Sequence, residues 1–422
     1  MSAGSLSLGL DLGTSGLRSA VLGADGRVVS MARAIYEGDP TSAEAWWSGA
    51  LACLKAQGAA LREAGIDAAR VDRIGVDGTS GSMVLTDADL VPLGPVLMYN
   101  SKGFDAEAEV ISRHAPDPHI ARGANSALAR AMRLVAQDGA GRAAHLLHQA
   151  DFIAARLMGR GGLSDVNNAL KTGVDPETGD WPDWIGAVIA PALLPQPLQP
   201  GAPFGPISAD IAEGLGLSPK AQVHAGTTDS IAAFLAAAPL KLGSAVTSLG
   251  TTLAVKLLSP SRIDVPQMGL YAHRLGGHWL VGGASNTGGG VLKAVLPGAD
   301  LAALSARIDP AVESPLDYYP LAAPGERFPI NDPDLSPRME PRPDDDAAFL
   351  HGLLESMARI EQQCYAAIAG QGGGWPEHLV TAGGGAANAT WTAIRERVLG
   401  RKIHASAETE AAIGTARLIQ GG

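Results

Sequence analysis

The motif GLDLGTSG at residues 9–16 sets a carboxylate inside a glycine-rich turn, directly behind the apolar start of the chain. Gly13 and Gly16 would let backbone N–H groups approach phosphate oxygens, and the Thr14 hydroxyl is a further donor. Asp11 would repel a phosphate unless a magnesium ion lay between them, since Mg²⁺ takes both carboxylate and phosphate oxygens as ligands. The motif therefore predicts a phosphate site that works with a metal ion, with Asp11 as the metal ligand.

The segments after this turn distinguish it from two other phosphate-binding motifs. Residues 17–22 and 27–30 are typical of two strands joined by a hairpin at residues 24–26. A dinucleotide fingerprint needs a helix to open at its last glycine, which this pattern excludes. No lysine in the chain follows a glycine, so the P-loop is absent as well. A purely structural glycine turn between strands fits this one motif equally well.

The length and the charge of the chain narrow the class of protein. Its 422 residues suit two large domains, and no stretch approaches the ~20 apolar residues of a membrane span. The net charge of −11, without clustered basic residues, argues against a nucleic-acid partner. Only two cysteines are present, and no basic region precedes the first apolar stretch. We therefore expect a cytoplasmic protein with reduced thiols.

Two further predicted strands end in turns of the same kind. Residues 71–76 are typical of a buried strand and lead into DGTSG at 77–81, and a strand at 222–225 leads into GTTD at 226–229. Asp229 then opens an apolar helix, where an aspartate can also serve as an ordinary N-cap. Because the carboxyl ends of strands gather at one crevice in α/β sheets, these turns predict a shared site.

The second half of the chain repeats the scheme of strands followed by helices. Its predicted elements are strands at 244–248, 253–258, 269–274 and 278–281, a helix at about 346–369, a GGG turn at 383–385, and helices at about 387–399 and 408–420. The pattern predicts two similar α/β domains, which we divide between residues 232 and 233.

The order of these turns resembles that of the FGGY carbohydrate kinases, within the actin-like (ribonuclease H-like) ATPase superfold. The local matches are most similar to those of the cyanobacterial and plant-type D-ribulose kinases. They lie at residues 74–81 (IGVDGTSG), 225–234 (AGTTDSIAAF), 245–250 (AVTSLG), 282–286 (GGASN), 317–320 (DYYP), 325–329 (GERFP) and 381–385 (TAGGG). The resemblance covers nearly the whole chain. It implies an α/β fold of two actin-like domains flanking a central cleft, with a sugar-binding domain at 1–232 and a nucleotide-binding domain at 233–422.

The resemblance also implies roles for individual residues. Asp229 would be the catalytic base that accepts the proton of the sugar hydroxyl, Asp11 would bind Mg²⁺, and Thr14 would donate to the transferred phosphate. The sugar would contact Asp11, Ser80, Asp229 and Ser230. The nucleotide would contact Gly13, Thr14, Gly250, Thr251, Gly288, Gly384, Gly385, Asn388 and Trp391. Trp391 fits a core position on its helix equally well, and Asp77 fits a brace of its own turn.

The function implied by the resemblance is the transfer of the γ-phosphate of ATP, with Mg²⁺, to a terminal hydroxyl of a ketopentose, D-ribulose first. A xylulokinase or another polyol or ketose kinase of the family is the nearest alternative, because hydroxyl geometry in a pocket decides sugar identity. A non-catalytic sugar-responsive actin-like protein is the alternative from another class. The expected partner is a small-molecule sugar, with no nucleic acid and no membrane, and a homodimer is left open.

Overall fold

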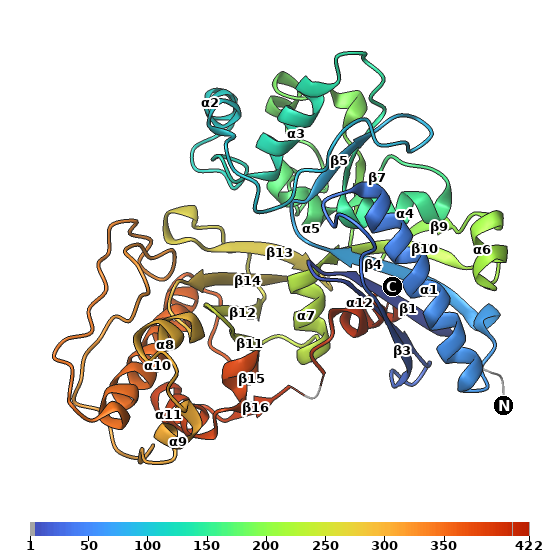
Figure 1. The fold of residues 1–422 in the computed structure, drawn as a ribbon. Helices are drawn as coiled ribbons and strands as arrows, with labels where there is room; N and C mark the ends of the chain where they lie inside the picture. Colours follow the sequence, from blue (N-terminus) through green and yellow to red (C-terminus); the bar gives the residue numbers. More distant parts are fainter. Residues whose placement is uncertain (1–4, 407, 422) are drawn as a thin grey trace. The chain divides into compact units, whose positions relative to one another are not determined.

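The computed structural model describes residues 5–406 and 408–421 and divides the chain into two compact units (Figure 1). The first unit comprises Met1–Ala236 and Glu408–Gly422, and the second comprises Ala237–Ala407. Each unit contains its own six-stranded mixed sheet, which confirms the predicted two-domain α/β fold. The predicted division placed residues 233–236 and the residues from Glu408 onward in the second domain, whereas here both belong to the first unit.

The sheet of the first unit combines an antiparallel and a parallel half. Its strands, in sheet order, are β3 (Val28–Ala34), β2 (Leu17–Leu22), β1 (Leu6–Leu12), β4 (Val71–Gly78), β10 (Gln222–Thr228) and β9 (Pro203–Pro206). The hairpin predicted after the first glycine turn is present, since β1, β2 and β3 pair antiparallel in chain order. β4 lies parallel to β1 and to β10, so the carboxyl ends of these three strands lie at the same edge of the sheet.

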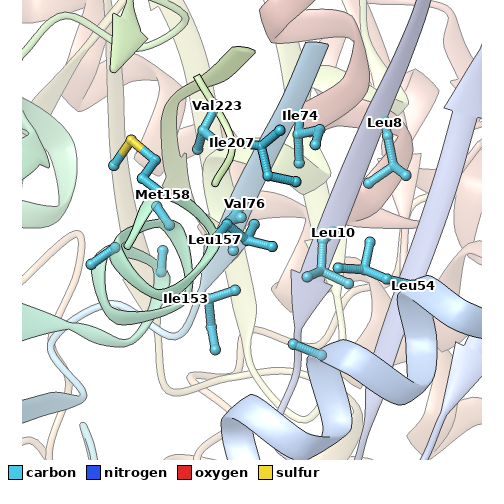
Figure 2. Close-up of a cluster of buried hydrophobic side chains, with 14 of the residues drawn as sticks. Leu8, Leu10, Leu54, Ile74, Val76, Ile153, Leu157, Met158, Ile207 and Val223 are labelled. Atoms are coloured by element: carbon cyan, nitrogen blue, oxygen red, sulfur yellow. The ribbon is translucent and has the colours of Figure 1, made fainter. Parts of the chain in front are cut away.

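Helices cover both faces of this sheet. Successive residues of β1 point to opposite faces, so each face has buried residues that a helix layer covers. Leu8 and Leu10 belong to the apolar core shared with α1 (Ala43–Glu63) and α4 (Gln149–Met158). Figure 2 shows this core, where Leu8, Leu10, Ile74 and Val76 of the strands lie near Leu54 of α1 and near Ile153 and Leu157 of α4. Gly9, between the two leucines, faces α12 (Ala411–Gln420) on the other side.

The C-terminal helix α12 packs closely on the first unit, which explains the difference in domain division. A Cβ atom on Gly9 would lie 2.0 Å from the Ala412 carbonyl oxygen, so only glycine lets β1 and α12 approach this closely. A Cβ atom on Gly414 of α12 would lie 1.8 Å from the carbonyl oxygen of Ala232, in α7 (Asp229–Ala237). α12 is therefore part of the sheet's second layer, together with α7, although about 170 residues of chain separate the two helices.

Further elements of the first unit lie between β4 and β10 in the chain. They are β5 (Met83–Thr86), α2 (Asp105–His114), α3 (Ala127–Gln137), β6 (His145–His148), β7 (Leu163–Asp165), α5 (Val166–Ala169), β8 (Gln196–Leu198) and α6 (Ala209–Leu215). β5, α2, α3 and β6 share an apolar cluster of their own, whereas α6 packs in the core of the main sheet. Short 3-10 helices occur at Ala68–Arg70, Leu170–Thr172, Asp183–Ala187 and Pro191–Leu193.

The second unit repeats the strand scheme of the first. In sheet order its strands are β13 (Tyr271–Leu275), β14 (His278–Ser285), β12 (Leu253–Ser259), β11 (Ser244–Leu249), β15 (His378–Ala382) and β16 (Ile403–Ala405). Its helices are α8 (Gly289–Val295), α9 (Leu301–Ser305), α10 (Asp346–Gly370) and α11 (Ala389–Leu399), with 3-10 helices at Pro266–Met268 and Gly384–Ala387. The long helix expected at about 346–369 is α10. In the described part of the chain, no helix is both long enough and apolar enough to cross a bilayer.

Candidate active site

Five of the predicted site residues line one open pocket of about 500 Å³ in the first unit. They are Asp11, Gly13, Thr14, Asp229 and Ser230. The other lining residues are Arg18, Ala233, Thr409, Glu410 and Ala411. We call this site the acidic pocket, since Asp11, Asp229 and Glu410 outnumber Arg18, the one cation among the described residues that line it. Carboxylates from the end of β1 and the start of α7 thus meet at one site.

Asp11 is nearly buried, 5% exposed, and it is surrounded by charged groups. Its register partner on the parallel strand β4 is Asp77, and Arg18 on β2 places Nη1 3.5 Å from its Oδ2. Burial raises the pKa of Asp11, whereas hydrogen bonding to Asp77 opposes that shift; the charge of Asp229 raises the pKa further, and Arg18 lowers it. The Asp11 carboxylate therefore lies between an acidic neighbour, Asp77, and a cationic one, Arg18.

Asp77 does not brace its own turn, in contrast to the interpretation from its sequence position. Its side chain is fully buried, and its Oδ2 accepts a hydrogen bond of 2.5 Å from the Thr415 hydroxyl on α12. Burial raises the pKa of Asp77 well above its ordinary range, and the neighbouring Asp11 charge adds to this shift. Of the two neighbouring carboxyl groups, Asp77 is consequently the one whose protonated form burial and the adjacent charge favour more strongly.

The glycine turn after β1 is closed more tightly than the sequence suggested. The Gly13 N–H donates to the carbonyl oxygen of Gly16 at 3.1 Å, so this donor is used within the turn and not held open for a phosphate. Tyr36, which follows the end of β3, donates its hydroxyl to the Gly13 carbonyl at 2.9 Å and so stabilises the turn. Thr14 is exposed in this turn and lines the acidic pocket, so it brings a side-chain hydroxyl to this site.

Arg18 and Glu410 are pocket residues that the sequence reasoning missed. Arg18 Nε lies 2.9 Å from Glu410 Oε2, and Arg33 Nη2 lies 2.8 Å from Glu410 Oε1. Arg18 stands only two residues beyond Gly16, which is a local signal that could have been used. Glu410 gives no such signal, because its place in the pocket depends on α12 packing against a sheet formed nearly 400 residues earlier.

Ser80 lies in the turn after β4, and it is not among the described residues that line the acidic pocket. The turn is held from two sides. Thr79 donates its N–H and its hydroxyl to Gln149 Oε1, at 3.0 and 2.8 Å. On the other side Arg130, which is 1% exposed, donates from Nε to the Gly81 carbonyl at 2.8 Å. Burial lowers the pKa of Arg130 to about 10, so the guanidinium stays charged at neutral pH.

A second pocket, of about 710 Å³, lies within the second unit and is mainly apolar. Most of the residues predicted to contact a nucleotide line it, namely Gly250, Thr251, Gly384, Gly385, Asn388 and Trp391. Further walls come from α8 and α9, including Leu292, Lys293, Leu301 and Ser305. Gly288 is not one of the lining residues, whereas the next two glycines are. We call this site the glycine pocket.

Two glycine turns meet at the floor of the glycine pocket. The Gly289 N–H donates to the Gly250 carbonyl and the Gly290 N–H to the Thr251 carbonyl, both at 2.9 Å. A Cβ atom on Gly288 would lie 2.8 Å from the backbone of Thr252, so a side chain would separate the turns. Gly288 thus contributes indirectly, by letting the start of α8 approach the end of β11.

Asn388 and Trp391 fix the opposite wall. Asn388 caps α11, since its Oδ1 accepts from the Trp391 N–H at 2.9 Å, and its Nδ2 donates to Ser305 Oγ at 2.8 Å. Trp391 is 2% exposed and belongs to the apolar core of the second unit while also lining the pocket. Its two alternative interpretations are therefore compatible, because one ring serves both the core and the wall.

Two models of one family match almost the entire chain. The model described as the FGGY family of carbohydrate kinases, N-terminal domain, matches residues 6–236, and the C-terminal domain model of the same family matches residues 245–419. The chain belongs to the FGGY family of carbohydrate kinases. It is accordingly a sugar kinase, a phosphotransferase, and the phosphate donor of FGGY kinases is ATP.

Solved structures agree with the fold of this FGGY kinase. A xylulose kinase from Rhodospirillum rubrum shares 23% identity with a TM-score of 0.85, over 99% of this chain and 90% of that one. A gluconate kinase from Lactobacillus acidophilus shares 14% identity with a TM-score of 0.82, over 99% and 89% of the two chains. A glycerol kinase from Plasmodium falciparum, solved with ADP, shares 15% identity with a TM-score of 0.82, over 98% and 88%. These proteins act on different sugars and polyols, so they do not distinguish a ribulose kinase.

The donor set of the acidic pocket fits a magnesium ion that arrives with a nucleotide. Within residues 5–406 and 408–421, no group of three or more His, Cys, Asp or Glu side chains could hold a metal ion alone. Mg²⁺ in kinases is commonly bound through one or two carboxylates together with substrate phosphates. Asp11 has the side chain that such a site uses, and Arg18 beside it lowers the pKa that burial raises.

Proposed function

We propose that this FGGY kinase transfers the γ-phosphate of magnesium-bound ATP to a terminal hydroxyl of a ketopentose, with D-ribulose as the first candidate. The observation that carries the proposal is the meeting of Asp11 and Asp229 in one pocket, on a chain whose family consists of carbohydrate kinases. Ribulose is favoured over xylulose by the motifs at residues 74–81 and 225–234.

Asp229 is the proposed general base. It is the first residue of α7, and its Oδ1 accepts the Ser230 N–H at 2.6 Å, so the helix start fixes the carboxylate and favours its ionised form. It accepts the proton of the sugar hydroxyl while that oxygen attacks the phosphorus atom. Ser230 lies at the rim of the same pocket, and Ser80 marks the neighbouring strand end as a further sugar contact.

The transferred phosphate is proposed to meet Thr14 and Arg18. The Thr14 hydroxyl is a neutral donor, and the Arg18 guanidinium supplies the positive charge that a phosphate needs beside three carboxylates. Asp11 would hold magnesium, which neutralises charge on the phosphate oxygens when it is bound. The glycine pocket would hold the rest of the nucleotide, with the apolar wall at the base and glycine turns at the phosphates.

A panel of sugars tests the proposal. Purified protein is incubated with ATP and magnesium and with D-ribulose, D-xylulose, glycerol or gluconate, and ADP release and sugar phosphate are both measured. We expect the highest kcat/KM for D-ribulose and little ADP release without sugar. Equal turnover of xylulose would remove the substrate assignment and leave the kinase in place. ADP release that no sugar changes would favour the non-catalytic or ATPase alternatives.

A further inference from the structure

Arg18 in the acidic pocket is held by two carboxylates at different distances. Its Nη1 is 3.5 Å from Asp11 Oδ2, whereas its Nε is 2.9 Å from Glu410 Oε2. The shorter contact is the one to Glu410, and it uses Nε. Nη1 is the nitrogen on the side of Asp11, and Arg18 lines the same pocket as Asp11 and Thr14.

Glu410 is itself fixed in place. It occupies the N-cap position of α12, yet its side chain makes no capping hydrogen bond and turns to the arginines. Arg33 on β3 binds its second oxygen at 2.8 Å. α12 cannot shift easily, because Gly414 lies directly against the Ala232 carbonyl and Thr415 donates to the buried Asp77. A carboxylate with both oxygens bound, on a helix packed this closely, is a rigid support for Arg18.

A closer ion pair with Asp11 competes with the observed position of Arg18. Without Glu410, the nearest carboxylate to the guanidinium would be Asp11, and opposite charges at hydrogen-bond distance attract strongly in a partly buried site. Arg18 would then move onto Asp11 and turn its donors away from a phosphate. The side chain of Arg18 is about a third exposed, so packing alone does not prevent this movement.

We propose that Glu410 is a positioning residue for phosphoryl transfer, which binds Arg18 at Nε so that the Nη donors face the transferred phosphate. The inference rests on the proposed function. Glu410 touches neither substrate in this scheme and acts through Arg18 alone. Its removal should therefore lower kcat, since the transferred phosphate is affected, and leave the KM values for sugar and ATP nearly unchanged.

The test is a double-mutant cycle with steady-state kinetics. Glu410→Ala should lower kcat roughly tenfold to a hundredfold, the size expected when a catalytic donor is misplaced by about 1 Å. Glu410→Gln keeps an oxygen for Arg18 Nε but cannot accept from Arg33 with its amide nitrogen, so its loss should be smaller. Arg18→Ala should be worse than either, and Glu410→Ala should add nothing in the Arg18→Ala background.

Glu44→Ala is the matched control. Glu44 pairs with Arg156 at 3.2 Å in the same unit, away from the acidic pocket, so this variant loses a similar ion pair and should keep wild-type kinetics. Additive losses in the double variant, or a KM increase that accounts for the whole effect, would overturn the role of Glu410. Glu410→Gln preserves side-chain size, so its kcat and KM values test the role of Glu410 even where the alanine variant folds poorly. A wild-type protein that phosphorylates no sugar would overturn the proposed function and this inference together, whereas an active wild type with additive losses overturns only the inference.

Discussion

The two units use the same sheet and differ at equivalent strand ends. Each six-stranded sheet contains three adjacent antiparallel strands followed by two parallel ones, and the sixth strand is β9 beside the parallel pair in the first unit and β13 beside the antiparallel strands in the second. The first strand of each sheet in chain order, β1 or β11, leads into the same kind of turn. The turn reads DLGT at residues 11–14 and SLGT at 248–251. In both, the glycine N–H bonds within the turn at 3.1 Å, to Gly16 and to Thr252 respectively. The first unit therefore places a buried carboxylate where the second has an exposed serine.

The next strand end shows the same contrast. β4 ends with Asp77 and Gly78, and the corresponding parallel strand β15 ends with Ala382 before Gly383. The first unit thus gathers titratable groups at the edge of its sheet, whereas the second gathers glycines around an apolar pocket. Under the proposed function, the strand ends of the first unit would carry the chemistry and those of the second would bind the nucleotide, so one kind of sheet would serve two roles.

The largest expected effect separates these two roles. Asp229→Asn should lower kcat for sugar phosphorylation about a thousandfold, within the range for loss of a general base. ADP binding to the glycine pocket, measured by calorimetry, should be unchanged. Asp210→Asn, which alters an exposed acid in the first turn of α6, is the control. Retained turnover in Asp229→Asn would place the base elsewhere and remove the contrast between the units.

The second unit also contains charge near its sheet, but in a closed pair. Glu361 on α10 and Arg395 on α11 are both fully buried, with contacts of 2.6 and 2.8 Å, and Thr247 of β11 donates to Glu361. Arg395→Met should lower the free energy of unfolding by about 3–5 kcal/mol, because it leaves a buried carboxylate without its cation. Hydrogen exchange in α10 during urea titration would measure this loss.

The double variant tests whether that pair is purely structural. Glu361→Leu with Arg395→Met should recover most of the lost stability, since no charge is then left buried. A double variant as unstable as Arg395→Met, or one that loses ADP affinity while folded, would mean that charge in the second unit does more than support the fold.

A smaller effect is expected from filling the glycine pocket. A Cβ atom on Gly384 would meet no atom within 4 Å, so Gly384→Val should fold normally while its side chain enters the pocket. We expect KM for ATP to rise about tenfold or more, equal to roughly 1.4 kcal/mol, with KM for the sugar unchanged. Gly370→Val, at an equally open position at the end of α10, is the control. An unchanged KM for ATP would show that the nucleotide lies elsewhere.

Local patterns in the sequence were sufficient for much of this comparison. The hairpin after Gly16, the helix that opens at Asp229 and the extent of α10 all follow from periodicity and turn residues over fewer than 30 positions. The predicted nucleotide contacts that line the glycine pocket were implied by the family resemblance, whose motifs lie at strand ends and helix starts. These features depend on neighbours in the chain, which a sequence displays directly.

The rest depended on contacts between distant segments. Nothing near residue 414 shows that α12 packs on β1, since the determining feature is the absence of side chains at Gly9 and Gly414. The partnership of Asp77 with Thr415, and of Arg18 with Glu410, follows from that packing. The Gly13 N–H was expected at a phosphate because a motif shows which donors exist, but not which of them the turn itself uses.

The last prediction concerns how the first unit tolerates its buried titratable groups. His148 is buried at the end of β6, where its Nε2 lies 3.1 Å from Thr172 Oγ1. Burial lowers its pKa to about 3, and the charge of Arg130 contributes to the shift. In the unfolded chain a histidine has a pKa of about 6.5, so between these values the unfolded state binds a proton that the native state does not. Stability therefore rises with pH across this window and falls on acidification.

His148→Gln removes this dependence while keeping a polar side chain beside Thr172. The free energy of unfolding should fall by about 2 kcal/mol more in the wild type than in the variant between pH 7.5 and pH 5, as 1.5 pH units below 6.5 imply. Urea titrations of both proteins at the two pH values give this difference directly. Burial raises the pKa of Asp165 to about 6, which has the opposite effect on stability, but both proteins retain it and its contribution cancels. An equal loss in the two proteins would mean that His148 is charged in the native state, and that the first unit pairs its buried groups as completely as the second.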